Sequence, residues 1–325
     1  MLRFDAEYIL PLRWCGSENI GDLTVYLREL SLLMDVTVVD GSPPELFEAH
    51  REAWGRMVRH LPPGQWPGRN GKVRNVMTGL RAARHERVVI ADDDVRYDAE
   101  SLARGLRLLT DASLVVPQNV FTAWPWHARW DTARQLINRA FGGDYPGTVF
   151  VRRSCIVACG YDGDVLFENL QLMRTVAAGG GFVCRALDLY VGRRPPTAGH
   201  FRSQRVRQAY DDFAQPVRLI AEAALLPMAV LAWRYFGGWA VAGAATASIV
   251  LAEVGRRRNG GTAAFPAVTS LWAPAWLAER AVCIWIAIGL RCAGGVRYSE
   301  GRIRHATTTP GTPPAADPRT VLESI

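Results

Sequence analysis

The sequence predicts an α/β protein in which a mostly parallel sheet flanked by helices is followed by transmembrane or interfacial helices. Three observations carry this prediction. Short apolar runs alternate with longer amphipathic runs through the first half of the chain, which is typical of parallel strands joined by helices. Acidic residues directly follow two of those apolar runs. Beyond residue 216 charged residues become rare, with nine in the 74 positions from 217 to 290.

The expected elements follow one another in an alternating order. Strands are predicted at residues 8–12, 36–39, 88–91, 114–116 and 182–186. Helices are predicted at residues 18–33, 73–83 and 166–177, because apolar residues recur there at helical spacing. The Pro- and Gly-rich stretch 62–71 is predicted to be a loop. The composition divides the chain into an α/β domain at 1–216, membrane-associated helices at 217–305 and a disordered tail at 306–325.

The net charge of +7 does not indicate a nucleic-acid-binding protein. Residues 1–216 hold 27 basic and 25 acidic residues, whereas residues 217–325 hold 11 and 6. The basic excess therefore accompanies the apolar runs, and a nucleic-acid-binding domain would instead concentrate it on a folded surface. This distribution favours a membrane surface as the partner.

Two apolar runs are long enough for a membrane hairpin. Residues 217–236 and 237–254 approach the roughly 20 residues needed to cross a bilayer, and Arg256–Arg258 follows at once. The positive-inside rule places that cluster in the cytosol, so we predict a multi-pass cell-membrane protein with a cytosolic α/β domain. The alternative is that 217–290 is the core of a soluble helical domain.

The third apolar run, 262–290, does not read as a simple span. Glu279 and Arg280 interrupt it, and arginines follow it. A single crossing would put one basic end on the wrong side of the membrane. The run is therefore an interfacial segment, a re-entrant pair or a strained hairpin.

The acidic triplet Asp92-Asp93-Asp94 follows the aliphatic strand at 88–91. Carboxylates at the end of a strand offer the hard oxygen ligands that Mg²⁺ or Mn²⁺ prefers, and such ions often bridge substrate phosphates. The alternative is a solvated acidic turn.

The order of these motifs resembles family 2 glycosyltransferases, the inverting enzymes of the GT-A fold. The matching pieces are Ile9-Leu10-Pro11, the acidic strand end at Asp40, the helix entry Gly71-Lys72 and the acidic triplet. The resemblance covers roughly residues 6–215. It implies a nucleotide-sugar donor held by Pro11, Asp40, Lys72, Asp92 and Asp93, and Mg²⁺ or Mn²⁺ held by Asp92 and Asp94.

The position that resembles the family's catalytic base is altered. The family usually has a Glu-Asp pair there, and this chain has Glu168-Asn169. Because an amide cannot take a proton from a sugar hydroxyl, Glu168 is the nearest candidate base, with Asp164 behind it. The alternative is that Glu168 only stabilises the first turn of a helix.

A second altered motif, Gln204-Arg205-Val206-Arg207-Gln208, resembles the family's Q-x-x-R-W. The resemblance assigns Gln204 and Arg207 to the donor, with the Arg207 guanidinium on the diphosphate. The missing Trp argues against a processive polymer synthase. The neighbouring arginines are equally compatible with gripping anionic lipid.

Trp124, Trp126 and Asp144 are candidates for the acceptor side, although aromatic clusters often only pack. Together these features predict a metal-dependent glycosyltransferase acting on a lipid-linked or glycan acceptor at the membrane. The alternatives are a catalytically impaired membrane scaffold and a nucleotidyltransferase. The sequence leaves the donor base, the sugar and the acceptor open.

Overall fold

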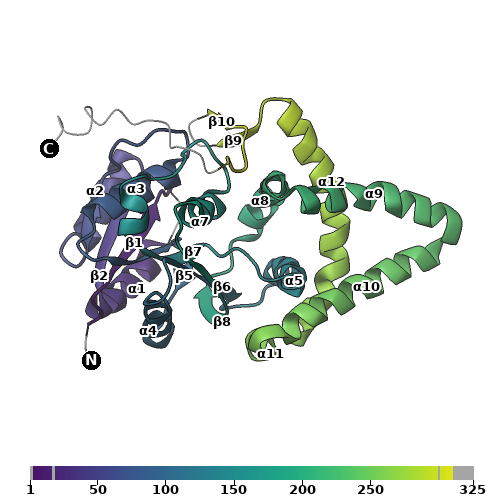
Figure 1. Cartoon of the computed structure of the whole chain (residues 1–325), viewed down its shortest axis with the longest axis horizontal. Coiled ribbons are helices and arrows are strands. Elements are labelled where there is room, and N and C mark those ends of the chain that lie inside the picture. The colour runs from purple at the N-terminus through teal and green to yellow at the C-terminus, as the bar shows by residue number, and fades with distance from the viewer. Residues whose placement is uncertain (1–2, 17–18, 299–300, 310–325) are drawn as a thin grey trace.

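The computed structural model describes residues 3–16, 19–298 and 301–309. The N-terminal part is built on one mixed sheet of eight strands in the order β3-β2-β1-β4-β7-β6-β8-β5 (Figure 1). The strands are β1 (Glu7–Leu12), β2 (Asp35–Asp40), β3 (Arg59–Leu61), β4 (Arg87–Ala91), β5 (Val95–Arg96), β6 (Leu114–Phe121), β7 (Thr148–Arg152) and β8 (Val183–Arg193). Four pairings are parallel, β1 with β2, β1 with β4, β2 with β3 and β6 with β8.

Both faces of the sheet are covered, because its strands place apolar side chains on each face in turn. Tyr8 and Leu10 of β1 belong to one buried cluster, and Ile9 between them belongs to another, because successive side chains point to opposite faces. The flanking helices are α1 (Ile20–Leu33), α2 (Pro44–Trp54), α3 (Gly71–Ala82), α4 (Ala99–Leu108), α5 (Trp126–Ala140), α6 (Ser154–Val157), α7 (Glu168–Ala178) and α8 (Ala198–Tyr210). The predicted α/β class is confirmed.

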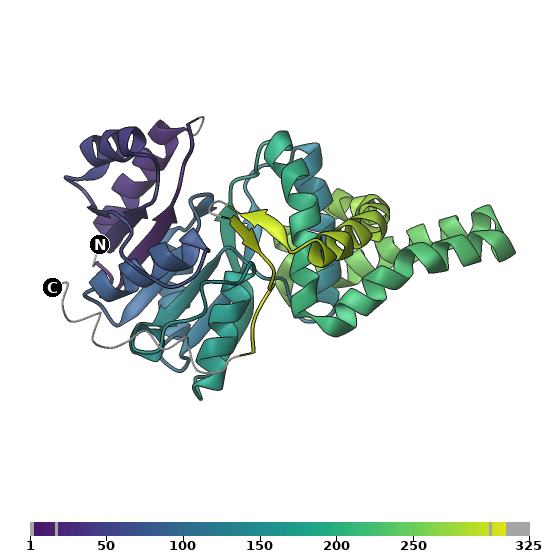
Figure 2. The same ribbon diagram turned by 90° about the horizontal axis from the view of Figure 1, so that it is seen from above.

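Four helices follow the sheet domain: α9 (Pro216–Phe236), α10 (Gly238–Arg257), α11 (Gly261–Ala264) and α12 (Ala273–Cys292). Helices α9 and α10 project away from the sheet domain as a hairpin (Figures 1 and 2). They meet at Gly237, whose φ of 58° suits a residue without a side chain. Three segments, 216–236, 238–264 and 267–292, are long and apolar enough to cross a membrane.

Helix α12 is held against the sheet domain at both ends. Near its start, the Trp272 ring lies 6.0 Å from the Trp130 ring of α5. After its end the chain forms a small hairpin of β9 (Val296–Tyr298) and β10 (Gly301–Ile303) and returns to the sheet domain. There the backbone N–H of Leu166 donates to His305 O at 2.9 Å.

The segment after β10 continues along α7. The N–H of Phe167 donates to Ala306 O at 2.8 Å, and the N–H of Thr308 donates to Gln171 Oε1 at 2.9 Å. Residues 306–309, predicted as part of a disordered tail, therefore pack on the domain. The remainder of that tail, 310–325, lies outside the described residues.

Candidate active site

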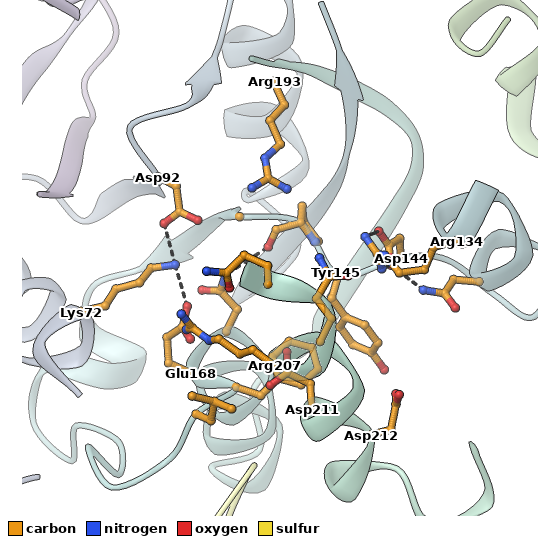
Figure 3. A pocket seen from close by; sticks show the side chains of 18 of the residues that line it. Lys72, Asp92, Arg134, Asp144, Tyr145, Glu168, Arg193, Arg207, Asp211 and Asp212 are labelled. Atoms are coloured by element: carbon orange, nitrogen blue, oxygen red, sulfur yellow. Dashed lines mark hydrogen bonds and ion pairs between the residues drawn. The ribbon is translucent and has the colours of Figure 1, made fainter. Parts of the chain in front are cut away.

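A cavity of about 440 Å³ lies where β1 and β4 end, beside the first turn of α7. Strand β1 has β2 on one side and β4 on the other, and such a reversal of strand order is where open α/β sheets bind ligands. Eight of the residues predicted from the sequence line this cavity: Pro11, Lys72, Asp92, Asp93, Asp144, Glu168, Gln204 and Arg207. Figure 3 shows the charged members converging from several elements.

Lys72 joins the two predicted acidic positions. Its Nζ lies 2.6 Å from Asp92 Oδ1 and 2.6 Å from Glu168 Oε1 (Figure 3). Burial alone would lower the pKa of Lys72, but the two carboxylates outweigh burial and raise the pKa. The Asn70 side chain caps α3 by accepting from the Lys72 N–H at 3.0 Å, which fixes the lysine in the first helical turn.

Glu168 and Asn169 both line the cavity at the start of α7. The Asn169 amide donates to Pro146 O at 3.1 Å, so the residue at the altered base position helps to hold a neighbouring loop. Glu168 is buried, with 8% of its surface exposed. Asp164 is not among the described lining residues; its side chain is 54% exposed, and it accepts from the Arg69 N–H at 3.2 Å.

The three aspartates of the acidic triplet have different surroundings. Asp92 lines the cavity beside Lys72. Asp93 Oδ2 accepts from Trp14 Nε1 at 2.5 Å, and burial raises the pKa of Asp93. Asp94 Oδ2 pairs with Arg193 Nε at 2.8 Å, whereas Asp94 Oδ1 is buried and has no hydrogen-bond partner among the described residues. Asp94 is not among the residues described as lining the cavity. Both Asp92 and Asp94 offer hard carboxylate oxygens, and the unpaired Oδ1 of Asp94 suits a divalent cation.

Asp40 lies beside the cavity and does not line it. Its Oδ1 accepts from the Ser42 N–H at 2.9 Å, and its Oδ2 lies 2.6 Å from His50 Nδ1 and 3.0 Å from His60 Nε2. Burial would raise the pKa of Asp40, but these hydrogen bonds lower the pKa to about 2. One carboxylate oxygen of Asp40 and one ring nitrogen each of His50 and His60 lie within 4.8 Å of one another. This spacing would allow the three side chains to hold a metal ion.

Arg207 lines the cavity under an aromatic ring that the sequence analysis missed. Its guanidinium lies 5.0 Å from the centre of the Tyr298 ring, and Tyr298 comes from β9, after the C-terminal helices. Gln208, which replaces the family's Trp, also lines the cavity. An aromatic face is therefore present beside the arginine, although it comes from a different part of the chain.

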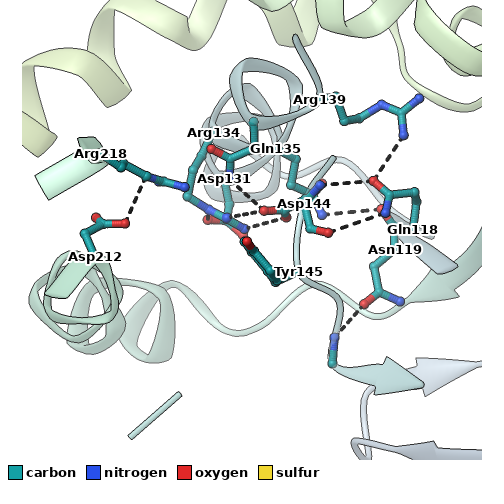
Figure 4. Close-up of polar contacts among 12 residues, drawn as sticks. Gln118, Asn119, Asp131, Arg134, Gln135, Arg139, Asp144, Tyr145, Asp212 and Arg218 are labelled. Carbon is teal, nitrogen blue, oxygen red and sulfur yellow. Dashed lines mark hydrogen bonds and ion pairs between the residues drawn. The ribbon is translucent and has the colours of Figure 1, made fainter. Parts of the chain in front are cut away.

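Asp144 is engaged in a polar network that shapes the cavity floor (Figure 4). Its carboxylate takes two hydrogen bonds from Arg134, at 2.8 and 3.1 Å, and one from Asn138 Nδ2 at 2.7 Å. On the other side its N–H donates to Gln118 Oε1 at 3.2 Å. With these partners Asp144 positions Arg134, which also lines the cavity.

The far end of the cavity is built by the C-terminal helices. Arg218 of α9 and Arg280 of α12 line it, together with Asp212. Arg280 is fully buried and lies 2.8 Å from Asp212 Oδ2, and Arg218 Nε lies 2.9 Å from Asp212 Oδ1. The sequence analysis treated Arg280 as an interruption of an apolar run, although charged residues within such runs often mark functional sites.

Trp124 and Trp126 lie at the junction with the C-terminal helices, outside the described lining of the cavity. Trp124 packs against the buried cluster that α5 shares with α12. The Trp126 ring lies 5.5 Å from Phe201 of α8. Trp126 is 40% exposed, and the Arg202 guanidinium lies 5.9 Å from the centre of its ring. The acceptor-side assignment of these two tryptophans stays a prediction.

Asp211 is a cavity-lining carboxyl that the sequence analysis missed, one helical turn after Arg207. Burial raises the pKa of Asp211 to about 7, although the positive charge of Arg207 opposes the rise. Between about pH 4 and pH 7 the carboxyl group of Asp211 is therefore protonated in the folded chain and ionised in the unfolded chain. A raised pKa of this kind contributes stability at low pH that is lost as the pH rises from about 4 to about 7.

Asp211→Asn is expected to remove this pH-dependent contribution. The Tm of the variant minus the Tm of the wild type is expected to increase between pH 5 and pH 8. Thermal unfolding in detergent measures it, with Asp188→Asn as the control because Asp188 is 59% exposed and pairs only at the surface with Arg104. A difference that stays constant over this range would contradict the raised pKa.

The fold is of the GT-A type, and the comparisons support a nucleotide-sugar glycosyltransferase domain. Residues 45–138 match the model of glycosyl transferase family 21, less than a third of the chain. The expected family was family 2, and the common conclusion, a glycosyltransferase with the GT-A fold, is confirmed. No curated protein matches the sequence.

Solved structures support the same fold. A mannosyltransferase from Pyrobaculum calidifontis, in complex with GDP-mannose and Mn²⁺, is 18% identical with a TM-score of 0.51, over 87% of this chain and 88% of that chain. That share exceeds residues 1–216, so the likeness extends into the C-terminal helices. Glucosyl-3-phosphoglycerate synthase from Mycobacterium tuberculosis is 16% identical with a TM-score of 0.41, over 59% of this chain and 72% of that chain. The fold assignment rests on the first of these.

Proposed function

We propose that this chain transfers a sugar from a nucleotide-sugar donor to a lipid-linked acceptor at the cytosolic membrane face, with inversion at the anomeric carbon. The observation that carries the proposal is the extent of the cavity. It runs from Lys72 and Asp92, at the strand ends, to Arg218 and Arg280, at the base of the C-terminal helices. One cavity therefore borders both the nucleotide half of the fold and the apolar helices.

The lining residues have chemically suitable roles for this transfer. The acceptor hydroxyl oxygen attacks the anomeric carbon of the donor sugar. The bond between that carbon and the diphosphate oxygen breaks, and the nucleoside diphosphate leaves. Glu168 takes the proton from the attacking hydroxyl as general base. Lys72 and Arg207 face the diphosphate and offset its charge. Once Lys72 turns to the phosphates, Glu168 is released from its ion pair.

Asp92 and Asp94 are the residues that would hold Mg²⁺ or Mn²⁺. Their carboxylates suit a hard cation, and Asp94 Oδ1 lacks a partner. When bound, such an ion offsets negative charge on the departing diphosphate. The Mn²⁺ and GDP-mannose bound by the Pyrobaculum calidifontis mannosyltransferase support this choice.

A second cavity supports a lipid-linked acceptor. It measures about 450 Å³ and lies between α9, α10 and α12, with only Ala, Leu, Met, Val and Pro side chains on its walls. Its wall includes Ala221 and Ala281, which lie three residues after Arg218 and one residue after Arg280. An amphiphile with hydrocarbon in this apolar cavity would therefore have its polar end near the active-site arginines.

The contacts of α12 bear on how the chain meets the membrane. The end of α10 touches the sheet domain, because Arg258 O accepts from Arg139 Nη2 at 2.8 Å. Both ends of α12 also contact that domain, through Trp272 and through the β9–β10 hairpin. A helix with both ends on one side of a bilayer does not cross it. We therefore place α12 at the membrane interface and only the α9–α10 hairpin within the bilayer, with Arg256–Arg258 in the cytosol.

This placement predicts that the N-terminus and the C-terminus lie on the same, cytosolic side. Reporters whose activity depends on the compartment, fused in turn to each terminus, are expected to give the same cytosolic response in cells. The untagged chain is expected to sediment with membranes. Three crossings would put the two termini on opposite sides, so opposite reporter responses would contradict the interfacial position of α12.

The experiment that tests the proposed activity measures release of nucleoside diphosphate from a panel of nucleotide sugars. The purified chain is used in detergent with a membrane lipid extract as the source of acceptor, with and without Mn²⁺. Release from one donor that depends on both the lipid and Mn²⁺ is expected. If no donor turns over, the catalytically impaired scaffold replaces the enzyme.

A further inference from the structure

A small cavity of about 100 Å³ adjoins the active site where β1 and β2 end and α3 begins. It shares Pro11, Arg13, Lys72 and Tyr298 with the large cavity. If Lys72 faces the diphosphate, as the proposed function assigns, the part of the donor beyond it is the nucleoside. The small cavity is then the place for the base, and the inference below rests on that proposed function.

Asn75 of α3 lines this cavity with an unusual polar atom. Its side-chain Nδ2 donates to Leu12 O at 3.0 Å and to Val39 O at 3.1 Å. Because both carbonyls can only accept, the amide orientation is fixed and Oδ1 points away from them. Asn75 is 3% exposed, and within the part of the chain that the structure describes its Oδ1 has no hydrogen-bond partner.

A buried acceptor without a partner is costly, since it has lost its hydrogen bond to water. A ligand that donates a hydrogen bond to it recovers that loss. Gly41, which also lines the cavity, leaves room beside the amide because it has no side chain. A Cβ at Gly41 would lie 3.4 Å from Asn75 Nδ2 and 3.7 Å from Asn75 Oδ1, so any side chain there would cover the amide.

Asp40, which the family resemblance assigns to the nucleotide-sugar donor, is already engaged. Its Oδ1 accepts from the Ser42 N–H, and its Oδ2 is shared between His50 and His60. At this edge of the sheet Asn75 Oδ1 is thus an acceptor with its hydrogen-bonding capacity unused. Its position at the ends of β1 and β2 matches the place where the base is expected.

We propose that Asn75 Oδ1 reads the donor base by accepting a hydrogen bond from a ring N–H. Uracil, thymine and guanine carry such an N–H on the edge that pairs with other bases, whereas cytosine and adenine carry a ring nitrogen that only accepts. A ring acceptor facing Asn75 Oδ1 would leave two acceptors opposed and the buried oxygen still unpaired. Asn75 is therefore a specificity-determining residue for the nucleotide.

Calorimetric titration of the full-length chain in detergent with Mn²⁺ tests this assignment. The probes are UDP, GDP, CDP and ADP, followed by the ring N-methylated form and the 2′-deoxy form of whichever binds best. UDP or GDP is expected to bind best, and N-methylation is expected to weaken binding by about 10- to 100-fold, the range for a lost hydrogen bond to a buried group. This comparison uses the wild-type chain and does not depend on a variant that folds.

Asn75→Leu provides the matching variant. It removes the acceptor, so the ratio of affinities for the parent and the N-methylated nucleotide is expected to fall to about one. Tightest binding of CDP or ADP, equal binding of the methylated nucleotide by the wild type, or a loss confined to the 2′-deoxy form would each overturn the assignment while leaving nucleotide binding intact. Failure of all four nucleotides to bind would overturn the proposed function as well.

Discussion

Glu168→Gln is expected to lower kcat by about 10²- to 10⁴-fold, the usual effect of losing a general base, while the affinity for the nucleoside diphosphate is largely kept. The glutamine retains the size of the side chain but cannot accept the proton from the acceptor hydroxyl. Lys72 keeps its second partner, Asp92, at 2.6 Å, so the donor end of the cavity stays charged as before. Steady-state turnover and calorimetric titration of the diphosphate separate the two effects.

The matched control for Glu168→Gln is Asp164→Asn. Asp164 was the second candidate base from the sequence, but it is 54% exposed and lies outside the described cavity lining. Its substitution is expected to leave turnover close to that of the wild type. Wild-type turnover in Glu168→Gln would show that Glu168 only stabilises the first turn of α7.

Asp94→Asn is expected to abolish the part of nucleotide affinity that depends on Mn²⁺. Substituting residues that merely support a metal ligand typically costs about 10- to 100-fold in metal affinity, and a direct ligand is expected to cost at least as much. The readout is the gain in diphosphate affinity on adding Mn²⁺, because the substitution also releases Arg193, which pairs with Asp94 at 2.8 Å. Calorimetric titration with and without EDTA measures this gain.

Asp188→Asn is the control for this second variant, since it removes an exposed carboxylate that pairs with Arg104. It is expected to keep the full gain from Mn²⁺. An Asp94→Asn variant that keeps the gain would rule out Asp94 as a metal ligand. The orphaned Oδ1 of Asp94 would then need another explanation within the fold.

The parts of the fold that the sequence predicted are those with strong local periodicity. β1, β2, α3 and β4 were all expected, because their apolar spacing is a local signal. The strands β3, β5 and β7 were missed. β3 and β5 have three and two residues, too few for a periodic pattern, and the antiparallel position of β7 between β4 and β6 depends on pairing with distant segments.

The candidate site divides in the same way. Asp92 was found because it follows a predicted strand, and Lys72 and Glu168 were found through the resemblance to family 2 glycosyltransferases. The ring of Tyr298 was missed, because it reaches Arg207 only after the chain has passed through the C-terminal helices. His50 and His60, which hydrogen-bond to Asp40, were also missed. His50 lies in α2 and His60 in β3, and neither segment was predicted. Residues brought in by tertiary contacts leave no local pattern in the sequence.

Lipid-phase transfer of a labelled sugar tests the central claim most directly. The purified full-length chain is incubated with a radiolabelled nucleotide sugar, Mn²⁺ and a membrane lipid extract, and the products are separated between organic and aqueous phases. The account predicts label in the organic phase, formed together with an equal amount of nucleoside diphosphate, carrying the inverted anomeric configuration and lost in Glu168→Gln. Label that remains in the aqueous phase for every donor, or an organic product formed equally well by Glu168→Gln, would contradict it.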